Sequence, residues 1–154
     1  MLGVIYDPIA DRMFLGEEGK GCTLNGEPVF VKATKGLQRA VVDLEVVNGE
    51  LVHDAPIRQG LRKAGALVVS LCSGSFAASL IASGQFTGLI YGHRSRWDAC
   101  ALDVIVREAG GQVTDFLGQP LSYGSDLDGF VASSGGQDHG VLLKLVQSAS
   151  QTFA

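Results

Sequence analysis

Asp98 is the residue of this sequence whose type and position could carry chemistry. It follows Trp97 and precedes an apolar helical pattern, so we expect it at or next to the N-cap of a helix. A carboxylate there most often accepts hydrogen bonds from free backbone N–H groups and stabilises the positive end of the helix dipole. A carboxylate is also a hard oxygen ligand for a divalent cation. The two roles are compatible, because one oxygen can cap the helix while the other faces an ion.

The elements that must position Asp98 follow from residues 96–121. Apolar side chains recur there at the three- and four-residue spacing of a helix packed on a core, namely Ala101, Leu102, Ile105, Val106 and Ala109. The glycines at 110–111 should end this helix, residues 112–115 should form a short strand, and residues 118–120 should form the next turn. The predicted strand therefore follows the helix with almost no intervening loop.

This stretch resembles the C-terminal signature of the inositol monophosphatase family of magnesium-dependent phosphomonoesterases. That signature reads WDxAA, then an apolar helix ending in EAGG, then vxDxxGxPL, and the matching residues here are 97–101, 108–111 and 115–121. A Trp-Asp pair alone would be weak, but agreement over a whole helix and turn is specific. The resemblance implies that Asp98 is a ligand for Mg²⁺ and that the substrate is a small phosphorylated metabolite.

The N-terminal residues resemble the same family. The family pattern VIYDPxxDxxFxAxxGxGAxxNGxPV is followed by residues 4–29, with Cys22 where the family usually has alanine. Alternating apolar runs and the Asn25-Gly26 turn predict an antiparallel meander. Its strands are expected at 2–6, 12–17, 22–24 and 28–31.

The rest of the chain alternates between strand and helix patterns. We expect strands at 40–44, 66–71, 88–91 and 129–132, and helices at 51–64, 73–83 and 139–148. The continuous apolar run at 66–71 predicts a strand buried on both faces. The fold class is therefore α/β, an α+β layered arrangement with a mixed sheet, like the C-terminal portion of the family fold. We expect a single domain over 1–154, with hairpins in 1–32 and the α/β portion in 40–150.

Two acidic segments look like the other metal motifs of the family but are rejected. Residues 7–11 resemble its DPxDGT motif and residues 16–18 resemble its GEE motif. In the register fixed by the Asn25-Gly26 turn, however, both lie on the later hairpin. Glu17 and Glu18 are also adjacent on a strand, so their side chains point to opposite faces and cannot converge on one ion.

The substrate side of the resemblance is partial. Counting back from Gly84 places Cys72, Ser73 and Gly74 at the family's glycine-serine-small turn, with Cys72 replacing the glycine. Ser73 could equally serve as a helix N-cap. Tyr91 stands seven residues before the signature aspartate, where inositol-selective members have glutamate. The resemblance thus assigns Ser73, Gly74 and Tyr91 to substrate binding but does not support selectivity for inositol.

Two hypotheses for function remain. In the family, the other metal carboxylates lie N-terminal to the hairpin where this sequence begins, so the resemblance implies a truncated chain. We expect the lone chain to bind Mg²⁺ weakly and to turn over phosphate esters poorly or not at all, and we assign no catalytic residue. The alternative is a non-catalytic module that kept the fold and uses it for binding or self-assembly.

Composition limits the partners. Hydrophobic residues make up 46% of the chain and the mean hydropathy is +0.24, which predicts apolar surface covered by a homo-oligomer or by a complementary N-terminal portion. The net charge of -4, with 12 scattered basic residues, argues against nucleic acid or a membrane as the partner. No apolar run reaches the roughly 20 residues of a membrane span and no signal peptide is evident, so we expect a cytoplasmic protein. Cys22, Cys72 and Cys100 are expected to be buried apolar residues.

Overall fold

The computed structural model describes residues 1–46, 53–93, 96–124 and 127–151. The N-terminal part forms a four-stranded antiparallel sheet in the order β1-β2-β3-β4. Its strands are β1 (Leu2–Asp7), β2 (Arg12–Glu17), β3 (Gly21–Leu24) and β4 (Glu27–Pro28). The predicted meander is confirmed, although its last strand is shorter than the expected 28–31.

A five-stranded mixed sheet follows, in the order β6-β5-β7-β9-β8. Its strands are β5 (Val41–Val46), β6 (Leu67–Val69), β7 (Gly88–Gly92), β8 (Gln112–Asp115) and β9 (Phe130–Ser133). Strand β5 runs parallel to β6 and β7, whereas β9 runs antiparallel to both β7 and β8. The predicted α/β class with a mixed sheet is thus confirmed.

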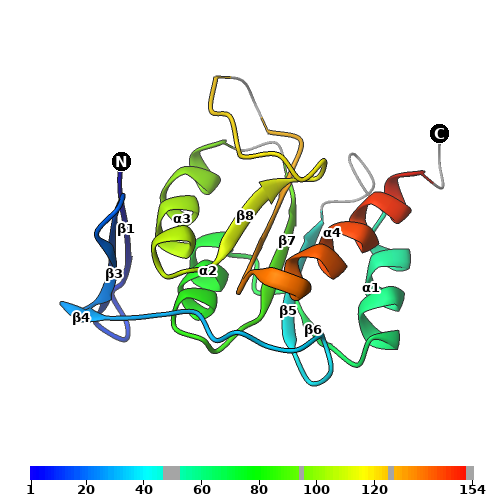
Figure 1. Cartoon of the computed structure of the whole chain (residues 1–154), viewed down its shortest axis with the longest axis horizontal. Coiled ribbons are helices and arrows are strands. Elements are labelled where there is room, and N and C mark those ends of the chain that lie inside the picture. Colours follow the sequence, from blue (N-terminus) through cyan, green and yellow to red (C-terminus); the bar gives the residue numbers. More distant parts are fainter. Residues whose placement is uncertain (47–52, 94–95, 125–126, 152–154) are drawn as a thin grey trace.

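Helices and sheets alternate in layers (Figure 1). The helices are α1 (Asp54–Lys63), α2 (Gly74–Ala82), α3 (Arg96–Glu108) and α4 (Gly136–Gln151). Helices α2 and α3 lie between the two sheets, and α1 and α4 cover the far face of the five-stranded sheet. None of the helices in the described part of the chain is long and apolar enough to cross a membrane.

Buried apolar side chains fill each space between these layers. One cluster, including Ile57 and Leu142, packs α1 and α4 on the five-stranded sheet. A second, including Leu102 and Phe130, packs α2 and α3 on its other face. A third joins the four-stranded sheet to α3 through Phe14 and its neighbours. Helix α3 therefore contributes to the packing of both sheets.

A glycine pair lets α3 approach the four-stranded sheet closely. Gly3 and Gly16 lie opposite each other on β1 and β2. A Cβ atom on Gly3 would lie 2.7 Å from the carbonyl oxygen of Ala101 in α3. Side chains at this pair would thus push the helix away from the strands.

Three expectations need correction. Strand β6 is an edge strand and Leu67 is 61% exposed, so the apolar run at 66–71 is not buried on both faces. Cys72 and Cys100 are exposed, and only the expectation for Cys22 is confirmed. Helix α3 begins at Arg96, so Asp98, which was expected at or next to the N-cap, is the third residue of the helix, within its first turn. Helix α1 begins at Asp54, and residues 51–52 of the predicted helix lie outside the described residues.

Candidate functional site

The candidate site lies at the carboxyl ends of the three parallel strands. A cavity of about 250 Å³ opens there, lined by Glu45, Val46, Ser70, Cys72, Tyr91 and His93. The chain leaves β5 for β6 through α1 on one face of the sheet and returns to β7 through α2 on the other face. Ligands of α/β proteins bind at such a point, where the strand order reverses.

Asp98 is held beside this cavity by Tyr91. The Tyr91 hydroxyl donates a hydrogen bond of 2.8 Å to Oδ2 of Asp98. Burial, together with the hydrogen bond to Asp98 and the negative charge there, raises the pKa of Tyr91. The phenol therefore stays protonated and fixes one oxygen of the carboxylate. The first turn of α3 also places Asp98 near the positive end of the helix dipole.

Ser73 and Gly74 lie next to Tyr91 at the start of α2. Ser73 is the N-cap, and its hydroxyl accepts a hydrogen bond of 3.3 Å from the backbone N–H of Phe76. A Cβ atom on Gly74 would lie 3.1 Å from the Tyr91 ring, so only glycine fits there without movement of the ring. The structure thus brings the four residues predicted from the sequence, Ser73, Gly74, Tyr91 and Asp98, into one neighbourhood.

Two buried carboxylates that the sequence reasoning missed hold the turn before α2. Asp43 and Glu45 lie on β5, two residues apart and hence on one face. Asp43 Oδ1 accepts a 3.0 Å hydrogen bond from the N–H of Leu71, and Glu45 Oε1 accepts one of 2.7 Å from the N–H of Ser73. Cys72 lies between these two amides with φ at 55°. The pair therefore fixes a turn that needs left-handed backbone at a non-glycine residue.

The negative charge of Glu45 makes ionisation of the buried Asp43 unfavourable. Asp43 is fully buried, and its Oδ2 accepts no hydrogen bond from any of the described residues. Burial, the contact with the Glu45 side chain and the negative charge of Glu45 raise the pKa of Asp43 to about 7. A proton held between the two side chains would supply the missing bond. The motif Asp-Leu-Glu inside an apolar run was the available signal for this pair.

The two rejected acidic segments have local structural partners. Asp7 accepts hydrogen bonds from the backbone N–H groups of Ile9 and Ala10 in the β1–β2 turn. Glu17 pairs with Lys20, and Glu18 pairs with the N-terminal ammonium. These contacts agree with the prediction that the segments are turn and strand residues.

In the ranges that the structure describes, no three His, Cys, Asp or Glu side chains gather closely enough to hold a metal ion by themselves. Mg²⁺ requires octahedral oxygen coordination, which one carboxylate does not provide. The Asp98 carboxylate has the chemistry of one such ligand, and the described residues show no cluster of three side chains of this kind around it.

A larger cavity, of about 480 Å³, opens elsewhere, between α3, β8 and residues 118–123. It contains none of the four predicted residues. At its wall Arg107 bonds the Asp103 carboxylate through Nε at 2.8 Å, and Tyr123 donates a hydrogen bond of 2.9 Å to the same group. Asp103, Arg107 and Tyr123 thus bond one another on this wall, and the cavity at the strand ends remains the candidate site.

Comparison with known proteins decides the family. The profile of the inositol monophosphatase family matches residues 1–151. The chain belongs to this family. It is 35% identical to inositol monophosphatase 1 of Solanum lycopersicum over 122 residues, which are 74% of this chain and 44% of the relative. It is 26% identical to inositol-1-monophosphatase of Synechocystis sp. over 162 residues, 99% of this chain and 53% of the relative.

A solved structure agrees in fold. The Thermotoga maritima IMPase superposes with a TM-score of 0.87 at 26% identity, covering 99% of this chain and 58% of that one. The predicted resemblance and the inositol monophosphatase fold are both confirmed. The chain spans about half the length of the curated relatives that it matches.

Proposed function

We propose that this chain takes part in magnesium-dependent hydrolysis of a phosphate monoester, with Asp98 as one metal ligand. Family membership supports the reaction class. The observation that carries the proposal is the hydrogen bond between Tyr91 and Asp98, which ties the signature carboxylate to a residue lining the cavity at the strand ends. A bound magnesium ion would activate water and stabilise the developing negative charge.

The chain's own residues would hold and orient the substrate. Tyr91 keeps one oxygen of Asp98 in place, and the turn before α2 brings Ser73 and Gly74 to the same side. Tyr91 stands where inositol-selective members have glutamate, so we propose a small phosphorylated metabolite without naming inositol. The remaining metal carboxylates would come from a complementary portion equivalent to the N-terminal motifs of the family.

The second candidate is a non-catalytic module that self-associates. Two observations favour it. The described residues contain no cluster of three or more His, Cys, Asp or Glu side chains that could hold a metal ion. The four-stranded sheet also exposes large apolar side chains on one face.

Phosphatase assays separate the two candidates. Wild type, Asp98→Ala, Asp98→Asn and the matched surface variant Asp54→Asn would be assayed with several sugar and inositol phosphates in millimolar Mg²⁺. With the complementary N-terminal portion of a relative added, the proposal expects Mg²⁺-dependent turnover that both Asp98 variants abolish and that Asp54→Asn keeps. The lone chain is expected to turn over these esters poorly or not at all. Turnover that survives Asp98→Ala would reject Asp98 as the ligand. Absence of turnover in every protein with that portion present would reject the enzymatic role and favour the self-associating module.

A further inference from the structure

A buried carboxylate forms part of the wall of the cavity at the strand ends. Glu45 is 7% exposed and lines this cavity together with Tyr91. The parallel register of β5 and β7 pairs Glu45 with Tyr91, so both side chains point to the same face of the sheet. The Glu45 carboxylate therefore belongs to the strand next to the position where inositol-selective members of the family have glutamate.

The protein uses only part of the hydrogen-bonding capacity of this carboxylate. An ionised carboxylate can accept about four hydrogen bonds. Glu45 Oε1 accepts one of 2.7 Å from the backbone N–H of Ser73. A proton on Asp43 occupies a second position, since Asp43 is fully buried, contacts the Glu45 side chain, and accepts no bond at Oδ2 from the described residues. Glu45 thus keeps acceptor capacity on the side that lines the cavity.

The same two contacts fix the orientation of the Glu45 carboxylate. Ser73 is the N-cap of α2, and Asp43 lies on β5 two residues before Glu45, so neither partner moves without its element. The hydrogen bond from the N–H of Leu71 to Asp43 holds the other end of the turn before α2. A carboxylate held in this way loses little conformational freedom when a ligand binds, and this strengthens binding.

The charge of Glu45 determines which part of a phosphate ester it can contact. An ionised carboxylate accepts hydrogen bonds, donates none, and repels the negative charge of a phosphate group. The hydroxyl of the neighbouring Tyr91 donates its hydrogen bond to Asp98. Glu45 is therefore suited to the alcohol portion of the ester, where a hydroxyl group can donate a hydrogen bond to it.

We propose that Glu45 accepts a hydrogen bond from a hydroxyl group of the substrate alcohol, and that Asp43 is the positioning residue that holds Glu45 in place. The inference rests on the proposed function, because it concerns a phosphate monoester bound in the strand-end cavity. It assigns to Glu45 the selection of esters whose alcohol carries a free hydroxyl close to the ester oxygen. An ester without that hydroxyl would displace water from a buried carboxylate and leave it unpaired, so it should bind less well.

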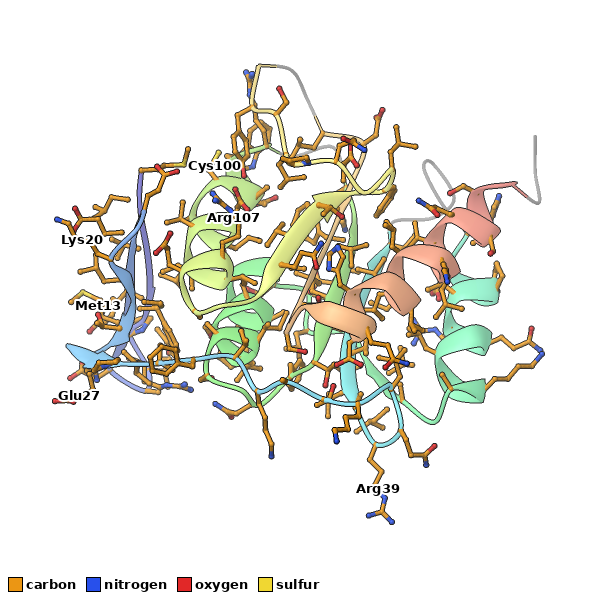
Figure 2. The ribbon with its side chains drawn as sticks, in the orientation of Figure 1. Met13, Lys20, Glu27, Arg39, Cys100 and Arg107 are labelled. Atoms are coloured by element: carbon orange, nitrogen blue, oxygen red, sulfur yellow. The ribbon has the colours of Figure 1, made fainter. Side chains whose placement is uncertain are left out.

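NMR of the lone chain with ¹³C-labelled glutamate tests the contact without metal or turnover. The probes are glycerol 2-phosphate and isopropyl phosphate, which differ only in the hydroxyl groups of the former. At tens of millimolar, glycerol 2-phosphate is expected to shift the carboxyl resonance of Glu45 clearly more than isopropyl phosphate does. The Glu27 resonance is the control, since Figure 2 shows Glu27 on β4, away from β5. Equal shifts of the Glu45 resonance, or none with either ester, would overturn the proposal.

Two variants test the positioning role of Asp43 in the same measurement. Asp43→Asn can still accept a hydrogen bond from Leu71 and donate one to Glu45, so it should keep the difference between the two esters. Asp43→Leu has a similar volume but cannot donate, and it should lose most of that difference. A difference that Asp43→Leu keeps would show that Asp43 does not position Glu45.

Kinetics with the complementary N-terminal portion of a relative added test the selectivity. Wild type should have a kcat/KM for glycerol 2-phosphate at least about tenfold above that for isopropyl phosphate. Glu45→Gln keeps an acceptor for the N–H of Ser73 but loses the charge, so it should lower this ratio by about tenfold, whereas Glu27→Gln should keep it.

The outcomes separate this inference from the proposed function. A ratio near one in wild type would overturn the selection of hydroxylated esters even if Glu45→Gln fails to fold. A high ratio that Glu45→Gln leaves unchanged would overturn the role of Glu45. Absence of turnover with either ester would reject the proposed function, and the NMR comparison of the two esters would then decide the contact alone.

Discussion

Among the residues that the structure describes, the five-stranded sheet has helices on both faces, whereas the four-stranded sheet has helices on one face. Strand β7 is buried along its whole length, as expected for a strand packed from two sides. Strand β1 carries an equally apolar sequence, LGVIY, yet its alternate residues Leu2, Val4 and Tyr6 are exposed. The apolar composition of β1 is thus typical of a strand that is covered on both faces. The described residues, however, cover only one face of its sheet.

This difference separates the side chains that stabilise the single chain from those that do not. Side chains on the inner face of the four-stranded sheet pack against α3 and stabilise the fold of the single chain. Side chains on its outer face are exposed and contribute little to that fold. Substitutions on the two faces of one strand should therefore lower the free energy of unfolding by different amounts.

The largest expected difference is between substitutions at two neighbouring residues of β2, Phe14 and Leu15. Phe14 is 1% exposed and packs against α3, so Phe14→Ala should lower the free energy of unfolding by about 3–5 kcal/mol. Leu15 points outward, and Leu15→Ala should cost less than about 1 kcal/mol in the monomer. Urea denaturation at a concentration where sedimentation shows monomer measures both. Equal losses would contradict the one-sided covering of this sheet.

The second-largest effect concerns the five-stranded sheet, whose strand β5 carries the buried carboxyl groups of Asp43 and Glu45. The pKa of Asp43 rises from its ordinary 3.8 to about 7 because of burial and of the neighbouring Glu45. The folded chain therefore holds a proton that the unfolded chain releases, and this stabilisation is complete below pH 4 and is lost as the pH rises through 7. Between pH 5 and pH 8 the free energy of unfolding should fall by about 2 kcal/mol.

Asp43→Asn should flatten that dependence, because its amide stays neutral at every pH in this window. Asp54→Asn, on the surface of α1, is the matched control and should keep the wild-type slope. Urea denaturation at several pH values gives the slopes. Parallel curves for wild type and Asp43→Asn would show that Asp43 is not the titrating group.

Local patterns predicted most elements of the fold. The Asn25-Gly26 turn, the glycines after α3 and the 3.6-residue spacing in 96–109 all depend on nearby residues, and the structure has the corresponding turn, helix end and helix. The position of β6 within its sheet depends on the order of the strands, and no local sequence pattern encodes that order. Its apolar run was therefore assigned to a buried strand, although it forms the edge.

The candidate site was predictable in part for the same reason. Family motifs marked Ser73, Gly74, Tyr91 and Asp98 along the sequence, and the fold places them together. Asp43 and Glu45 match none of the family motifs quoted above, and their role depends on two amides 28 residues further along the chain. Only the pairing of β5 with its parallel neighbours brings those groups within hydrogen-bond distance.

The smallest effect concerns the link between α3 and the four-stranded sheet. Glu108, in the EAGG segment, accepts hydrogen bonds from the backbone N–H groups of Gly19 at 3.0 Å and Gly21 at 2.9 Å. Glu108→Gln keeps one acceptor oxygen and loses the charge, so it should cost about 1 kcal/mol of unfolding free energy. The exposed Glu27→Gln is the control and should leave stability unchanged. Hydrogen exchange should show faster exchange at the Gly19 and Gly21 amides in Glu108→Gln, and unchanged exchange there would mean that α3 holds the sheet through apolar packing alone.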